Sequence, residues 1–291
     1  MQDSSVEGSQ TDSRAQELLT PAVQIERLQA GDAGERYYAA WWLGRMRVQA
    51  GLSALIAALE DDLDQTLQGG YPLRRNAARA LGKLRDPEAI PPLLLCLGSS
   101  DRQLWAVAAQ ALAEIAGDHP EWQARVIESL LACLASTNQE SGDNASLSVD
   151  PQMEVVLEAV LEALGDLQAQ AAISSLATYR NHPSIRMQSA ANRALYRITG
   201  IPSFAEGLFP LLKTDNIHLR RAVVLDLGST GYLAAASAIA TASVEANIKL
   251  HSLKTLADLY LSNYLSRHPE NSSPPLDSEF PKLLEWIDSL L

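Results

Sequence analysis

The sequence predicts an all-α protein, a right-handed superhelical solenoid of about six helix pairs. The first observation is a repeat: Arg36-Tyr-Tyr-Ala-Ala-Trp-Trp-Leu-Gly aligns without a gap with Arg74-Arg-Asn-Ala-Ala-Arg-Ala-Leu-Gly, 38 residues later. The second is that a different apolar run lies between successive copies. The third is that no segment alternates apolar and polar residues between hairpin turns, as strands do. A repeat period of roughly 20–50 residues is typical of arrays of stacked supersecondary units.

The first pattern recurs along most of the chain. Later copies are Ala108-Ala-Gln-Ala-Leu-Ala, Val160-Leu-Glu-Ala-Leu-Gly, Ala190-Ala-Asn-Arg-Ala-Leu and Arg220-Arg-Ala-Val-Val-Leu-Asp-Leu-Gly. The intervening runs are Leu52-Ser-Ala-Leu-Ile-Ala-Ala-Leu, Ile90-Pro-Pro-Leu-Leu-Leu-Cys-Leu, Val126-Ile-Glu-Ser-Leu-Leu-Ala-Cys-Leu and Ala171-Ala-Ile-Ser-Ser-Leu. Each unit is therefore predicted to be two short antiparallel helices over residues 20–265. The small residues of the first pattern let neighbouring pairs approach closely and bury a continuous apolar seam.

Three segments do not fit the repeat. Residues 1–19 are rich in Ser, Gln and Asp and are expected to be disordered, and residues 136–150 are expected to form a polar loop inside the array. Residues 266–291 are expected to form a Pro/Ser-rich linker, up to residue 281, and a C-terminal helix. Apolar residues follow helical spacing in that helix: Phe280, Leu283, Leu284, Ile287, Leu290 and Leu291. The helix either caps the last repeat or binds a partner.

Composition excludes several classes of protein. The net charge of −12 disfavours nucleic-acid binding, and no run reaches the roughly 20 apolar residues of a membrane span. The N-terminal segment has no signal-peptide pattern, and two cysteines in apolar helical runs, Cys96 and Cys133, favour a reducing compartment, so a cytoplasmic location is expected. The five histidines lack metal-ligand spacing, so no metal site is expected. No catalytic constellation stands out, and the catalytic residues stay unassigned.

Four aromatic residues lie close together in the first repeat. At helical spacing Tyr37, Tyr38, Trp41 and Trp42 share one face with Arg45. The next two repeats place Arg75, Asn76, Arg79, Ala80 and Lys83, then Ala106, Val107, Gln110, Ala111 and Glu114, at these positions. Polar residues at equivalent positions indicate an outward face, with Trp42 nearer its boundary. The exposed rings are either a binding surface or a cap over the open end of the solenoid.

The chain resembles HEAT-repeat proteins over roughly residues 20–265, with the turn at Asp86-Pro87 and the polar elbow at Gly98-Ser-Ser-Asp. More specifically, Tyr37-Tyr-Ala-Ala-Trp-Trp-Leu-Gly-Arg is similar to a motif of the E subunits of heterodimeric E/F-type phycobilin lyases. The similarity continues through Gly69-Gly-Tyr-Pro-Leu-Arg-Arg-Asn-Ala-Ala-Arg-Ala-Leu-Gly-Lys-Leu and Leu219-Arg-Arg-Ala.

This resemblance implies an enzyme subunit that acts with an F-type partner subunit. Together they would attach phycocyanobilin through a thioether to a cysteine of the phycocyanin α subunit, or in a related pair to phycoerythrocyanin α. The nucleophilic thiol belongs to the acceptor, and phycocyanobilin is the substrate, with no tightly bound cofactor. The alternative is a non-catalytic HEAT-repeat adaptor or chaperone for phycobilisome assembly.

A bilin is a flat conjugated tetrapyrrole with two propionates, so it needs aromatic contact and cations. The candidates for binding the bilin or a partner are Tyr37, Tyr38, Trp41, Trp42, Arg45, Arg74, Arg75 and Arg79. The alternative role of the arginines is an inter-repeat ladder with the acidic run at residues 60–64.

Overall fold

The computed structural model describes residues 20–140, 151–267 and 279–291, without the side chains of 137–140 and 267. Within these ranges the regular structure is helical and contains no strand, so the predicted all-α solenoid of helix pairs is confirmed. The chain divides into two compact units, residues 1–163 and 164–291. The segment expected to be disordered, residues 1–19, lies outside the described residues.

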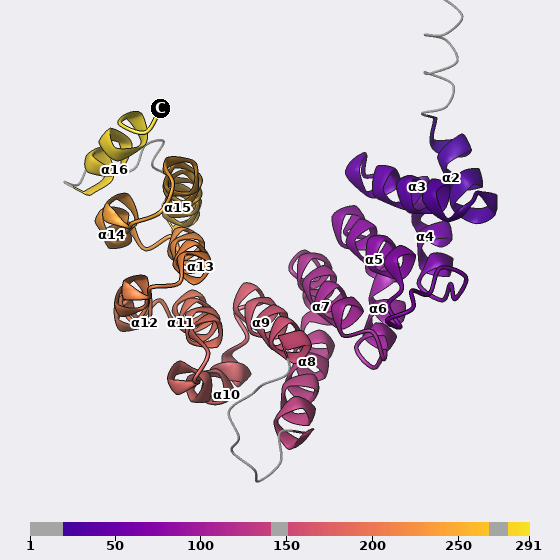
Figure 1. Cartoon of the computed structure of the whole chain (residues 1–291), viewed down its shortest axis with the longest axis horizontal. Helices are drawn as coiled ribbons and strands as arrows, with labels where there is room; N and C mark the ends of the chain where they lie inside the picture. The colour runs from indigo at the N-terminus through magenta and orange to yellow at the C-terminus, as the bar shows by residue number, and fades with distance from the viewer. Residues whose placement is uncertain (1–19, 141–150, 268–278) are drawn as a thin grey trace, which may run out of the picture. The chain divides into compact units, whose positions relative to one another are not determined.

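The first unit stacks its helices in two layers. Its elements are α2 (Pro21–Ala30), α3 (Ala33–Arg45), η1 (Gln49–Gly51), α4 (Leu52–Ala58), α5 (Pro72–Leu84), η2 (Pro87–Ala89), α6 (Ile90–Cys96), α7 (Arg102–Ala116), α8 (Pro120–Glu140) and most of α9 (Pro151–Asp166). Helices α3, α5 and α7 lie side by side in one layer (Figure 1). Helices α4 and α6 pack against α5 and α7 from the other layer. The layer of α3, α5 and α7 carries the candidate binding residues.

The second unit repeats this design and ends in a cap. Its elements are η3 (Gln170–Ala172), α10 (Ile173–Thr178), η4 (Tyr179–Asn181), α11 (Ile185–Thr199), α12 (Pro202–Glu206), η5 (Phe209–Lys213), α13 (Ile217–Gly228), η6 (Leu233–Ala235), α14 (Ala236–Thr241), α15 (Ala246–Arg267) and α16 (Glu279–Asp288). Helix α16 buries Phe280, Leu283 and Ile287 in a core shared with α14 and α15. Of the two roles considered for the C-terminal helix, the structure shows capping.

Polar side chains fix where the helices begin. Asp32 accepts a hydrogen bond from the backbone N–H of Glu35 at 2.9 Å, and the Glu35 carboxylate accepts one from the Asp32 N–H. This reciprocal pair is a capping box, which satisfies two N–H groups that the helix itself leaves unpaired. Asp101 caps α7 in a similar way, through the N–H groups of Gln103 and Leu104. The residues at which α3 and α7 begin are therefore set by local sequence.

Glycines place neighbouring helices of this layer in backbone contact. The glycine that ends the Leu-Gly pair of a repeat faces an alanine of the next helix: Gly44 faces Ala80, Gly82 faces Ala111 and Gly165 faces Ala194. A Cβ atom added at Gly44 would lie 2.6 Å from both Cα and Cβ of Ala80, closer than carbon atoms can pack. The expected role of the small residues in close stacking is confirmed.

Gly44→Ala is expected to lower the free energy of unfolding by about 1–3 kcal/mol, because the methyl group would force α3 and α5 apart. The matched control is Gly34→Ala in the first turn of the same helix, where the glycine is exposed and an added Cβ has no close backbone neighbour. The control should be neutral or slightly stabilising, since alanine is the better helix former. Urea titrations of both variants test this, and equal losses would contradict it.

Two predicted loop boundaries need correction. Helix α8 runs to Glu140, so residues 136–140 of the expected loop are helical, and residues 141–150 lie outside the described residues. Residues 136–140 contain no Gly or Pro, and Gln and Glu readily extend a helix. Likewise α15 ends at Arg267 and α16 begins at Glu279, so residues 266–267 and 279–281 of the expected linker are helical, and residues 268–278 lie outside the described residues. Pro281 lies in the first turn of α16, where a proline removes no intrahelical hydrogen bond.

Candidate functional site

The aromatic residues of α3 form an exposed face, called here the aromatic face: Tyr37, Tyr38 and Trp41. Tyr37 and Tyr38 are each 43% exposed and Trp41 is 41% exposed, whereas Leu43 is fully buried. The rings of Tyr38 and Trp41 lie 5.4 Å apart, centroid to centroid, at an angle of 36°. Trp42 is half-buried at the boundary of this face, as expected. The predicted outward orientation of the aromatic face is therefore confirmed.

The register of the repeats holds for two of the outward positions. Arg79 of α5 and Gln110 of α7 are exposed like Trp41, and Lys83 and Glu114 are exposed like Arg45. Since α3 packs against α5 and α5 against α7, these side chains share the outward side of one layer.

The expectation that Asn76 faces outward is wrong. Asn76 is 4% exposed, and its side-chain amide donates a hydrogen bond to the carbonyl of Tyr37 at 2.7 Å. This position of the repeat faces the preceding helix of the layer. Val107, which occupies the same position in α7, is buried as well. Helix α3 is the first of this layer among the described residues, which leaves Tyr38 exposed at the same position. Asn76 also ties α5 to the turn of α3 that carries the aromatic face.

The first arginines of the motifs in α3 and α5 both bind the loop that links α4 to α5. Arg36 donates to the carbonyl of Leu28 at 3.2 Å and pairs with Asp61. Arg74 donates to the carbonyl of Asp61 at 2.7 Å and to that of Glu60 at 3.3 Å, and it pairs with Asp62. Arg74 therefore takes part in the ladder with the acidic run at residues 60–64.

The second arginine of the motif in α5 reaches forward to the next repeat. Arg75 binds Asp101 through Nε at 2.6 Å and a terminal nitrogen at 2.7 Å, and Asp101 also accepts from the backbone N–H of Tyr71 at 2.9 Å. Burial disfavours the charged form of Asp101, but the hydrogen bonds and charge of Arg75 hold the pKa of this carboxyl below its usual value. Arg75 is thus an inter-repeat tie, with a partner outside the predicted acidic run.

Three cations remain available beside the aromatic face. Among the described residues Arg45, Arg79 and Lys83 make no ion pair or hydrogen bond. Arg45 and Arg79 were among the candidates from the sequence. The structure therefore gathers Tyr37, Tyr38, Trp41, Arg45 and Arg79 on one outward side. It engages Arg74 and Arg75 in contacts within the protein.

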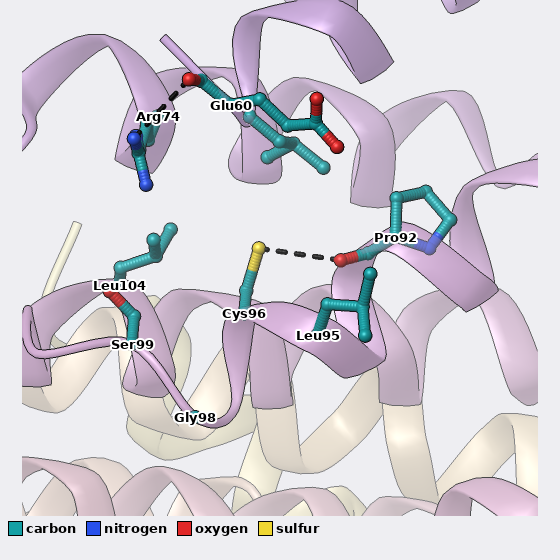
Figure 2. A pocket seen from close by; sticks show the side chains of 9 residues that line it. Glu60, Arg74, Pro92, Leu95, Cys96, Gly98, Ser99 and Leu104 are labelled. Carbon is teal, nitrogen blue, oxygen red and sulfur yellow. Dashed lines mark hydrogen bonds between the residues drawn. The ribbon is translucent and has the colours of Figure 1, made fainter. Parts of the chain in front are cut away.

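A pocket of about 330 Å³ lies in the first unit (Figure 2). It is bounded by the start of the loop after α4, by α5 and α6, and by the turn and first residues that lead into α7. Its lining is mainly apolar, with Leu95 and Cys96 on one wall and Glu60 and Arg74 opposite them. The thiol of Cys96 contacts the carbonyl of Pro92 at 3.5 Å.

The environment of both cysteines disfavours the nucleophilic thiolate. Cys96 and Cys133 are both free and buried, as expected, and burial raises the pKa of each thiol to about 11. Reactive cysteines need the thiolate at ambient pH, so a raised pKa argues against either thiol as the nucleophile.

No group of three or more His, Cys, Asp or Glu side chains in the described ranges is placed to hold a metal ion. None of the described helices is both long and apolar enough to cross a bilayer.

Comparisons with known proteins match both the repeats and the whole chain. A family profile for HEAT repeats matches residues 21–113 and 71–145. The phycocyanobilin lyase subunit alpha of Nostoc sp. (strain PCC 7120) is 42% identical over 275 residues, which cover 94% of each chain. The bilin biosynthesis protein PecE of Mastigocladus laminosus is 38% identical, over 95% of this chain and 97% of the relative.

A solved structure agrees with these relatives. A chain in the complex of CpcE and CpcF of phycocyanin lyase from Nostoc sp. PCC7120 is 39% identical and superposes with a TM-score of 0.74. The match covers 94% of this chain and 95% of that chain. Sequence and structure thus agree over nearly the full length. The chain therefore belongs to the HEAT-repeat family of phycocyanobilin lyase alpha subunits.

Proposed function

We propose that the chain is the E-type subunit of a bilin lyase that attaches phycocyanobilin to a cysteine of the phycocyanin α subunit, together with an F-type partner. The names of its full-length relatives and the two-protein complex of its structural relative support this function. The observation that carries it in the structure is the aromatic face with Arg45 and Arg79 beside it. A generic HEAT adaptor has no need for exposed rings at this point.

The surface matches the chemistry of a bilin. A flat conjugated tetrapyrrole gains contact with the rings of Tyr37 and Trp41, and its two propionates gain cationic partners in Arg45 and Arg79. Arg74 and Arg75 act indirectly, since they fix the loop and the helix on which Arg79 stands. Cations with no internal partner can bind a ligand without first breaking an ion pair.

Catalysis by such a surface consists mainly of positioning. The sulfur of the acceptor cysteine forms a bond to the ethylidene carbon of the bilin, and the thiol proton ends on the adjacent ring carbon. This addition balances without an oxidant or reductant. Holding the two reactants in the productive orientation replaces a random encounter and limits wrong stereochemistry.

Coexpression tests the function directly. The chain, an F-type subunit, the phycocyanin α subunit and a source of phycocyanobilin are produced in one host. A denaturing gel is then viewed for zinc-induced fluorescence of the α band. A covalently coloured α band that requires both subunits is expected. A band of equal strength without this chain would instead favour an adaptor role.

Replacing both cysteines by alanine is expected to leave bilin transfer unchanged, because the acceptor supplies the only reacting thiol. Each substitution removes a buried side chain and should cost about 1–3 kcal/mol of stability. The α-band fluorescence of a double Cys96→Ala, Cys133→Ala variant measures transfer, and its circular dichroism checks folding. Loss of transfer in a folded variant would indicate a covalent intermediate on this chain.

Two free, buried cysteines also favour the cytoplasm as the site of action.

A further inference from the structure

Residues 59–71, which link α4 to α5, carry two fully exposed leucines and are called here the leucine loop. The relative exposure of Leu63 is 86% and that of Leu67 is 102%. Each leucine lies in a tight turn, a position usually occupied by Gly, Pro, Asn, Asp or Ser. Two apolar side chains at successive turns make a concentrated apolar surface.

Ion pairs and hydrogen bonds of the other loop residues fix the loop conformation in which these leucines are exposed. Asp61 pairs with Arg36 and Asp62 with Arg74, and Asp64 accepts a hydrogen bond from the backbone N–H of Leu73 at 2.7 Å. The backbone N–H of Thr66 donates to the carbonyl of Gly70 at 2.8 Å, and the Gly69 N–H donates to the carbonyl of Thr66 at 2.9 Å. A loop fixed at both ends and across its middle presents its leucines in one arrangement, which lowers the entropy lost on binding.

The leucine loop is bound to the helix that carries the aromatic face. Its residue Asp61 pairs with Arg36, and Arg36 directly precedes Tyr37 in α3. The bond that the proposed function requires forms between the bilin and a cysteine of a second protein. That protein must therefore approach the helix that carries the aromatic face, and the leucine loop is bound to this helix.

We propose that the leucine loop docks the acceptor phycobiliprotein subunit during bilin transfer, an inference that rests on the proposed function. Leu63 and Leu67 supply the apolar contact. The exposed carboxylates of Glu60 and Asp62 border them, the side chain of Asp62 being 75% exposed. The complementary surface on the acceptor is an apolar patch bordered by Lys or Arg side chains.

The test measures binding of the bilin-free phycocyanin α subunit to the full-length chain in complex with its F-type partner, by calorimetry and without bilin. A double Leu63→Ser, Leu67→Ser variant is expected to raise the dissociation constant by about tenfold or more, as loss of central apolar contacts does. Glu60→Lys should raise it by about threefold, since it reverses one bordering charge. Both variants should keep the thermal midpoint and the affinity for the F-type partner.

The matched control is Leu291→Ser, which removes a leucine of 80% exposure from the other unit and should leave acceptor binding unchanged. An unchanged dissociation constant in the double variant would overturn the proposal. Loss of affinity for the F-type partner would also overturn it, because the loop would then be the subunit interface. The proposal would also be overturned if the wild-type complex with the F-type partner did not bind the bilin-free phycocyanin α subunit. Because the assay contains no bilin, failure of the transfer reaction itself would count only against the proposed function.

Discussion

Replacing Trp41 by alanine is expected to reduce bilin transfer by about 5- to 150-fold while the protein stays folded. A ring stacked on a planar ligand contributes about 1–3 kcal/mol, by analogy with base–aromatic stacking, and each 1.36 kcal/mol corresponds to a tenfold change in rate. Trp41 is 41% exposed and lies outside the core, so its loss should cost only about 1 kcal/mol of stability. Initial rates of α-subunit labelling, together with thermal midpoints, measure both effects.

The control in the same helix is Leu43→Ala. Leu43 is fully buried, and its truncation should cost about 2–5 kcal/mol of stability. Trp41→Phe keeps a ring and should recover much of the transfer rate. If the thermal midpoint of Trp41→Ala is as low as that of Leu43→Ala, the aromatic face contributes to the packed core rather than to a binding surface. Wild-type transfer by a folded Trp41→Ala variant would remove the ring from the bilin site.

Arg75→Met is expected to cost about 3 kcal/mol of stability, because it leaves the carboxylate of Asp101 buried without its cation. The Asp101 side chain is only 2% exposed, and Arg75 supplies two of its hydrogen bonds. Adding Asp101→Asn to Arg75→Met should restore part of the loss, since an amide needs no counter-charge and asparagine still caps α7. Denaturant unfolding of the single and double variants measures this. A double variant no more stable than Arg75→Met would contradict the ion-pair explanation.

The same pair predicts a pH dependence. The pKa of Asp101 is lowered in the folded state, so its contribution to stability is present above the ordinary aspartate pKa and is lost as the pH falls through the folded value. The stability gap between wild type and Arg75→Met should therefore narrow in acid, where Asp101 becomes protonated in both. Arg79→Ala is the control, because Arg79 is exposed and has no described ion pair. Its effect should stay within about 0.5 kcal/mol at every pH.

The fold was predictable because the repeat carries its own register. Aligned copies place Trp41, Arg79 and Gln110 at one outward position, and all three are exposed. The same alignment failed for Asn76, since polarity was taken as a sign of exposure. Asn76 is buried because the carbonyl of Tyr37 accepts its hydrogen bond, and such a partner on another helix cannot be read from composition.

The candidate site was predictable only in part. The partner of Arg74 lies in the expected acidic run, but Asp101, the partner of Arg75, was visible in the sequence only as part of a turn. Its role as the cap of α7 was the available signal, because a capping aspartate stands at the entry of a helix that neighbours α5. The leucine loop was missed because only the acidic residues of this segment were considered, as partners of the arginines.

The glycine contacts between helices also determine how the array comes apart. Each contact joins a repeat only to the next one, so the free energy that holds a terminal repeat is nearly independent of repeats farther along. In Gly44→Ala, amide hydrogen exchange should accelerate first in α2 and α3, while amides of α5 and α7 keep their protection. The chain would then release the helix that bears the aromatic face by fraying from one end, with the rest of the array still folded. Activity would disappear at temperatures where circular dichroism still reports most of the native helix.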